Sequence, residues 1–209
     1  MFKPVVVENR ITTKDSKLHE GNRFFFNGHQ EIRMQFELKS ISAQSIPEAL
    51  AKVERYRLLN EPSLAESICL DIMAIEPGHQ QALISLLLAR TDQFQSNVQA
   101  KAAQEVLAQI SGEYEQAYYA GIIWERLGHA RIRQDVHTGG AAAYRALQQA
   151  MSHYETAIDL AYRGNDDAIL RWNTCARMIM QNPEIQPQPE SEPSDAWVRD
   201  EANSSIADA

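Results

Sequence analysis

Hydrophobic and polar residues follow two different periods along the chain. Near the start, Ile32, Met34, Phe36 and Leu38 alternate with polar residues without a miss, which is the period of a half-buried β-strand. From residue 45 onward, apolar residues recur instead at spacings of three and four, which is the period of an amphipathic α-helix. The pattern therefore predicts a mainly α-helical chain that is preceded by a small strand-rich segment, residues 1–44.

The predicted strand follows a turn signal. Asn27-Gly28 suits a β-hairpin, since both central residues of its tightest turn need positive φ. A helix over residues 32–41 remains an alternative, because Ile32 and Phe36 are also spaced for one helix face, but the unbroken alternation favours a strand. Its apolar face needs cover and its edge needs a partner. Either residues 5–7 complete a three-stranded sheet, or the edge pairs with another chain, including a second copy of this one.

Prolines and glycines divide residues 45–181 into helices. Pro47 and Pro62 suit first helical turns, and Pro77-Gly78 suits a helix end. In the second helix, Leu64, Ile68, Ile72 and Ile75 would form one apolar stripe. The glycine pair Gly139-Gly140 predicts a loop over residues 131–140. The expected helices span residues 49–59, 62–75, 79–89, 97–110, 113–131, 141–162 and 168–180, with Asn165-Asp166-Asp167 capping the last.

Charge separates the end of the chain from the rest. Residues 182–209 hold four prolines and seven acidic residues against one arginine, a net charge of −6 out of −8 for the whole chain. Such a segment has too little apolar surface to offset its ordering entropy, so the sequence predicts an acidic, disordered tail. The remaining residues carry only −2 and no strong basic field, so nucleic acid is not an expected partner.

Two of the predicted helices share a spacing of small and large residues. Ala65, Cys69, Ile72 and Ile75 align with Ala150, Tyr154, Ala157 and Leu160. This spacing resembles the second helix of a tetratricopeptide repeat, in which small residues let helices approach closely. Pro77 matches the proline that ends the motif, whereas Tyr162 replaces it in the later copy. The resemblance covers about residues 46–180, with longer connecting loops in the middle copies.

The resemblance implies a superhelix of antiparallel helix pairs that ends in a capping helix, residues 168–180. It also implies protein or peptide binding in a concave groove lined by the first helix of each pair. The candidate groove residues are Glu54, Arg57, Leu86, Arg90, Tyr118, Ile122 and Arg126. Glu54 lies at an inward position where it would repel a partner's terminal carboxylate. The segment beginning Gly164-Asn165 is also similar to the end of bacterial repeat proteins of unassigned role.

Candidate chemistry is sparse. His137 lies beside Asp135 and the glycine pair, but no second histidine follows at metal-ligand spacing, so we expect no catalytic, metal or cofactor site. Cys69 and Cys175 suggest two buried, reduced thiols. A basic cluster of Arg126, His129, Arg131 and Arg133, with Lys101 and Arg145 as candidate neighbours, is either ordinary solvated surface or an acceptor for an acidic segment, from a partner or from the chain's own tail.

The chain carries no apolar run long enough to span a membrane and no basic start followed by an apolar stretch, which predicts a cytoplasmic protein. Together these features predict a non-enzymatic interaction scaffold or adaptor. A chaperone of the kind that serves secretion systems is an alternative of the same class. An enzyme or enzyme subunit that uses residues 126–140 is the alternative of a different class.

Overall fold

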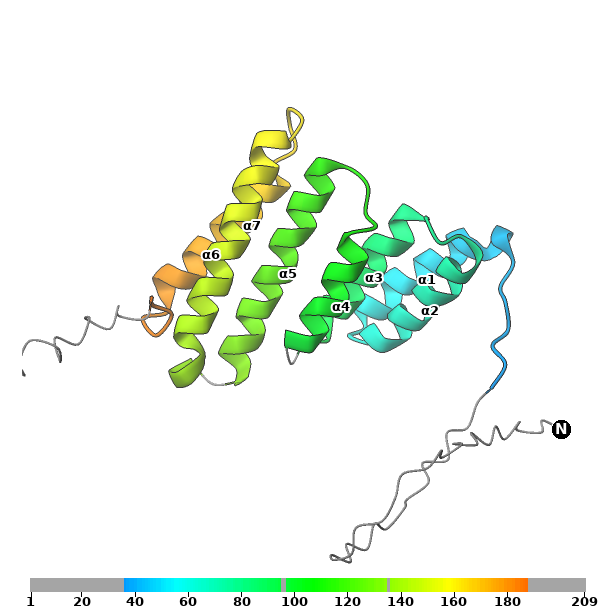
Figure 1. Ribbon diagram of the computed structural model, residues 1–209, viewed down its shortest axis with the longest axis horizontal. Coiled ribbons are helices and arrows are strands. Elements are labelled where there is room, and N and C mark those ends of the chain that lie inside the picture. The colour runs from blue at the N-terminus through cyan, green and yellow to red at the C-terminus, as the bar shows by residue number, and fades with distance from the viewer. Residues whose placement is uncertain (1–35, 95–96, 135, 188–209) are drawn as a thin grey trace, which may run out of the picture. The chain divides into compact units, whose positions relative to one another are not determined.

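α-Helices account for nearly all regular structure in the described residues of the computed structural model, which are 36–94, 97–134 and 136–187. The elements are η1 (Ala43–Ser45), α1 (Ile46–Leu58), α2 (Pro62–Ile75), α3 (Gln80–Asp92), α4 (Asn97–Leu107), α5 (Glu113–Gln134), α6 (Val136–Leu160) and α7 (Asp167–Gln181). Figure 1 shows the helices side by side in chain order, from α1 in cyan to α7 in orange. The prediction of a mainly helical chain is confirmed.

The predicted strand region lies mostly outside the described residues, including Ile32 and Met34. Residues 36–40 are described and have no regular secondary structure; Phe36 and Leu38 are exposed there. The chain divides into two units, Met1–Ser40 and Ile41–Ala209. All the described helices belong to the second unit, and no described helix is long and apolar enough to cross a membrane.

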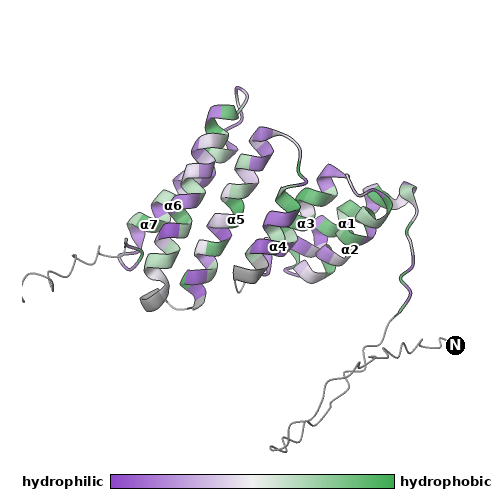
Figure 2. Ribbon diagram, in the orientation of Figure 1, coloured by the Kyte–Doolittle hydropathy of each residue, from purple (hydrophilic) through white to green (hydrophobic). Residues whose placement is uncertain are grey.

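The helices of the second unit form two layers. Each helix packs against the next in the chain, and in addition α1 packs against α3 and α3 against α5. Equivalent contacts between α2 and α4, or between α4 and α6, are weaker or absent among the described residues. Because α1, α3 and α5 lie closest together, they form the inner layer of the stack. Figure 2 shows hydrophobic and hydrophilic residues interspersed along each helix, as expected for amphipathic helices that bury one face and expose the other.

The two aligned sets of residues have the same burial. Ala65, Cys69 and Ile72 on α2 are 0% exposed, as are Ala150, Tyr154 and Ala157 on α6. The fourth members, Ile75 and Leu160, are 38% and 42% exposed and therefore lie at the surface. Small residues at the first two positions of α2 allow close contact with both α1 and α3, so these positions are enclosed. The prediction that Leu64 and Ile75 belong to the apolar stripe of this helix is therefore wrong, because both residues are exposed.

The predicted loop at residues 131–140 is a helical hairpin. α5 continues to Gln134, α6 begins at Val136, and Gly139 and Gly140 lie within α6. A Cβ atom on Gly139 would lie 2.6 Å from the carbonyl oxygen of Arg131, and one on Gly140 would collide with the carbonyl oxygen of Glu184. The glycine pair therefore lets the backbones of Arg131 and Glu184 approach α6 closely. The predicted loop at these glycines is wrong.

The chain that follows α7 departs from the predicted tail boundary. α7 ends at Gln181, but Ile185 returns to the body and is buried in the cluster formed by α5, α6 and α7. The chain is thus still packed on the body at Ile185, although residues 182–184 and 186–187 are exposed. The predicted cap of α7 is confirmed only in part, because Asp166 precedes the helix without a side-chain cap hydrogen bond, whereas Asn165 Oδ1 accepts one from the N–H of Asp167 at 3.2 Å.

Candidate partner-binding groove

A cavity of about 940 Å³ opens on the inner layer of the stack. The ends of α1 and α3 and the second half of α5 form its walls, so residues 35 or more apart in sequence meet there. Four predicted residues line it, namely Glu54, Arg57, Arg126 and Arg133. The remaining lining residues are Leu58, Asn60, Pro62, Thr91, Asp92, Gln93 and Phe94. We refer to this cavity as the inner groove.

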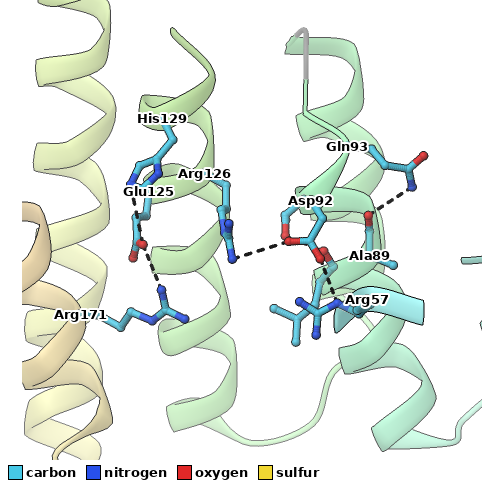
Figure 3. A network of polar contacts seen from close by, with 10 residues as sticks. Arg57, Ala89, Asp92, Gln93, Glu125, Arg126, His129 and Arg171 are labelled. Carbon is cyan, nitrogen blue, oxygen red and sulfur yellow. Dashed lines mark hydrogen bonds and ion pairs between the residues drawn. The ribbon is translucent and has the colours of Figure 1, made fainter. Parts of the chain in front are cut away.

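Asp92 organises the polar wall of the inner groove. Its Oδ2 accepts a hydrogen bond from Arg57 Nε at 2.9 Å, and its Oδ1 lies 3.5 Å from Arg126 Nη2 (Figure 3). A single carboxylate on α3 therefore connects α1 to α5. The buried Nε of Arg126 has no hydrogen-bond partner among the described residues. Since a guanidinium carries five N–H donors, both arginines keep donors that Asp92 does not use.

Glu125, the residue before Arg126, faces the opposite way. Its side chain is 3% exposed; Oε2 accepts a 2.6 Å hydrogen bond from the Tyr154 hydroxyl, and Oε1 accepts a 3.0 Å hydrogen bond from Arg171 Nη1. His129 Nε2 lies 3.9 Å from the same Oε1 (Figure 3). Glu125 therefore connects α5 to α6 and α7. Its buried charge is compensated by the Tyr154 hydroxyl, a hydrogen-bond donor, and by the cationic Arg171.

Burial governs the acid–base properties around Glu125. Burial, followed by the nearby Glu125 carboxylate, raises the pKa of the Tyr154 hydroxyl, which keeps it protonated as a donor. Burial opposes the charged form of Arg171, but the Glu125 carboxylate, Tyr118 and Tyr154 together outweigh this and raise its pKa. Burial lowers the pKa of His129 despite the attraction of Glu125, and the surrounding arginines add to this effect. His129 is thus a neutral packing residue near neutral pH.

Four other predicted residues do not line the inner groove. Leu86 and Ile122 are buried in the core, and Tyr118 stacks on Tyr114 with ring centroids 5.8 Å apart. Arg90 lies on the other side of α3, where it donates to Glu66 Oε1 at 2.9 Å and to the carbonyl oxygen of Ala102 at 3.1 Å. Residues 90 and 92 are two positions apart, so they point to opposite sides of the helix.

The predicted basic cluster is also divided, because its residues point to different sides of α5. Arg126 and Arg133 line the inner groove, whereas Arg131 lines a second cavity together with Lys101 and Arg145. His129 is partly enclosed beside Glu125. The cluster is therefore not one patch, and its members face two different surfaces of α5.

Sequence reasoning missed Asp92, which holds two of the predicted arginines. The sequence shows only a single carboxylate near the end of a predicted helix, and it does not show which side of that helix faces the groove. The side chain of His137 lies outside the described part of the chain. No group of three or more His, Cys, Asp or Glu side chains that could hold a metal ion occurs among the described residues.

Both cysteines are buried and unpaired, as predicted. Burial raises the pKa of the Cys69 thiol to about 12, and burial likewise raises that of Cys175 to about 12. The thiolate is the reactive form, so neither side chain is suited to nucleophilic chemistry near neutral pH.

Comparison with protein-family models finds no match, and neither the curated proteins nor the solved structures give a significant match.

Proposed function

We propose that this chain is a non-enzymatic scaffold that binds a partner protein or peptide in the inner groove. We also propose that its stack is a degenerate form of the tetratricopeptide type. The observation that carries the proposal is the inner groove itself, in which charged side chains from three non-consecutive helices surround one cavity. Support for the repeat type comes from the equal burial of the aligned residues on α2 and α6.

The groove residues suggest how a partner is held. Arg57, Arg126 and Arg133 face Glu54 and Asp92, so the lining carries a small excess of positive charge. The ion pairs with Asp92 restrict two guanidinium groups before a partner arrives, which reduces the side-chain entropy lost on binding. Their remaining donors suit carboxylates and backbone carbonyls. The expected partner therefore presents an acidic or mixed-charge segment, not a lone C-terminal carboxylate.

Residues 1–44 are the second contact surface in this proposal. Phe36 and Leu38 are the described members of the predicted apolar face, and both are exposed. An exposed apolar pair next to further apolar residues in the sequence is a feature of interaction segments. Strand addition to a partner, or to a second copy, would cover it.

Affinity capture from cells that make the protein tests the proposal. Tagged full-length chain should retain one protein in near-stoichiometric amount. Charge reversal by Arg133→Glu should reduce that yield at least about tenfold, a change equivalent to about 1.4 kcal/mol. Arg177→Glu is the matched control, because Arg177 is an exposed arginine on α7 that does not line the groove. Equal yields from both variants, or no stoichiometric protein, would contradict the proposal.

A further inference from the structure

A second groove lies on the other layer of the stack, between α4, α5 and α6. It encloses about 620 Å³ and has an apolar floor that includes Ile123, Trp124 and Leu127. Lys101, Arg131 and Arg145 stand around it, one from each helix, and none of its lining residues is acidic. We refer to it as the outer groove. Its combination of cations around an apolar floor differs from the inner groove, whose lining includes Glu54 and Asp92.

The described chain ends close to the outer groove. Ile185 is buried, and the carbonyl oxygen of Glu184 approaches Gly140 so closely that a Cβ atom would not fit. Ala142 and Arg145 of the same helix line the outer groove. Positions 140 and 142 lie on opposite sides of α6, so a chain that continues from Pro187 must pass around the first turn of this helix.

The rest of the chain has the length and the chemistry to fill the groove. Residues 188–209 carry six acidic side chains and one arginine, and their only aromatic residue is Trp197, between Ala196 and Val198. Ten residues beyond Pro187 span up to about 33 Å when extended. A helix with its side chains is about 10–12 Å across, so Trp197 can reach the far side of α6.

We propose that the acidic C-terminal segment, residues 188–209, docks in the outer groove of its own chain, with Trp197 on the apolar floor. The acidic residues on either side of Trp197, which include Glu192, Asp195 and Glu201, pair with Lys101 and Arg145. Aromatic anchors flanked by ion pairs are the usual form of such contacts. This docking is independent of the inner groove and places the two acceptors on opposite layers of the stack.

Zero-length carbodiimide coupling on the full chain tests this docking, because it joins a lysine amine to a carboxylate only when the two are in contact. We expect peptides that link Lys101 to acidic residues of 190–201. Lys52 is the internal control, since it is exposed on α1 and does not line the groove. Links at Lys52 as abundant as those at Lys101, or no links to Lys101, would overturn the proposal.

Three variants and one mixing experiment complete the test. Trp197→Ala should reduce the Lys101 links at least about fivefold. Arg145→Glu should do the same, whereas Arg133→Glu, on the inner groove, should leave them unchanged. The reverse order would assign the acidic segment to the inner groove and overturn the proposal. In a mixture of ¹⁵N-labelled and unlabelled chains, links within one isotope support docking in cis, and mixed-isotope links contradict it.

Discussion

Replacement of Gly121 by alanine is the sharpest test of the packing between α5 and α6. A Cβ atom at Gly121 would lie 2.6 Å from Cδ1 and 2.9 Å from Cζ of Tyr154. The ring is fully buried, and its hydroxyl is held by Glu125 at 2.6 Å, so it cannot swing away without losing that hydrogen bond. The clash is therefore with a fixed aromatic ring, and not with the end of a flexible side chain.

The net effect follows from opposing contributions. Alanine in place of glycine favours a helix interior by about 1 kcal/mol. Overpacking of a core costs about 1–3 kcal/mol, and loss of a hydrogen bond to a charged acceptor costs about 1.5–3 kcal/mol. We therefore expect Gly121→Ala to lower the free energy of unfolding by about 1.5–5 kcal/mol.

Urea unfolding followed by circular dichroism measures this change. Gly78→Ala is the matched control, because a Cβ atom there meets nothing within 4 Å. Its free energy of unfolding should stay within about 0.5 kcal/mol of the parent value. A Gly121→Ala protein as stable as the Gly78→Ala protein would refute the close contact between α5 and Tyr154.

Three further predictions follow from the polar and buried groups. Asp92→Asn should lower the free energy of unfolding by about 1 kcal/mol, since partly exposed ion pairs contribute little more than this. The loss should be smaller at high salt, and the control Asp159→Asn, at an exposed site, should leave the free energy of unfolding unchanged. Because the pKa of His129 is lowered in the folded protein, the unfolded chain takes up a proton at this histidine first as the pH falls, and the folded state loses stability below about pH 6.5. His129→Gln should therefore flatten this part of the plot of urea midpoint against pH. An unchanged plot would contradict the lowered pKa. Cys69 and Cys175 should resist maleimide at pH 7 and react fully in denaturant, whereas fast native labelling would contradict their raised pKa values.

Local sequence signals predicted much of the helical framework. Pro47 and Pro62 lie in the first turns of α1 and α2, and the Asn165 side chain accepts a hydrogen bond from the first N–H of α7. The aligned small residues on α2 and α6 are fully buried. These features succeed because each depends on the residue's own backbone preferences or on the 3.6-residue period.

The failures concern features that depend on contacts distant in sequence. The glycine pair at 139–140 predicts a loop, since its close approach to the backbones of Arg131 and Glu184 leaves no local sign in the sequence. The division of the basic cluster required the phase of α5, which its scattered apolar residues do not fix. Ile185 has no periodic neighbours, so nothing in a proline-rich segment indicated that it returns to the core.

Site-specific photo-crosslinking tests the central claim most directly. A photoreactive amino acid is placed at Glu54 or Arg133, which line the inner groove, or at Lys52 or Arg177, which are exposed and do not. The full-length chain is irradiated in cells that make the protein, and adducts are resolved by mass. Binding in the inner groove predicts one discrete adduct from the first two positions and none from the other two. No adduct from the groove positions, or equal adducts from all four, would contradict it.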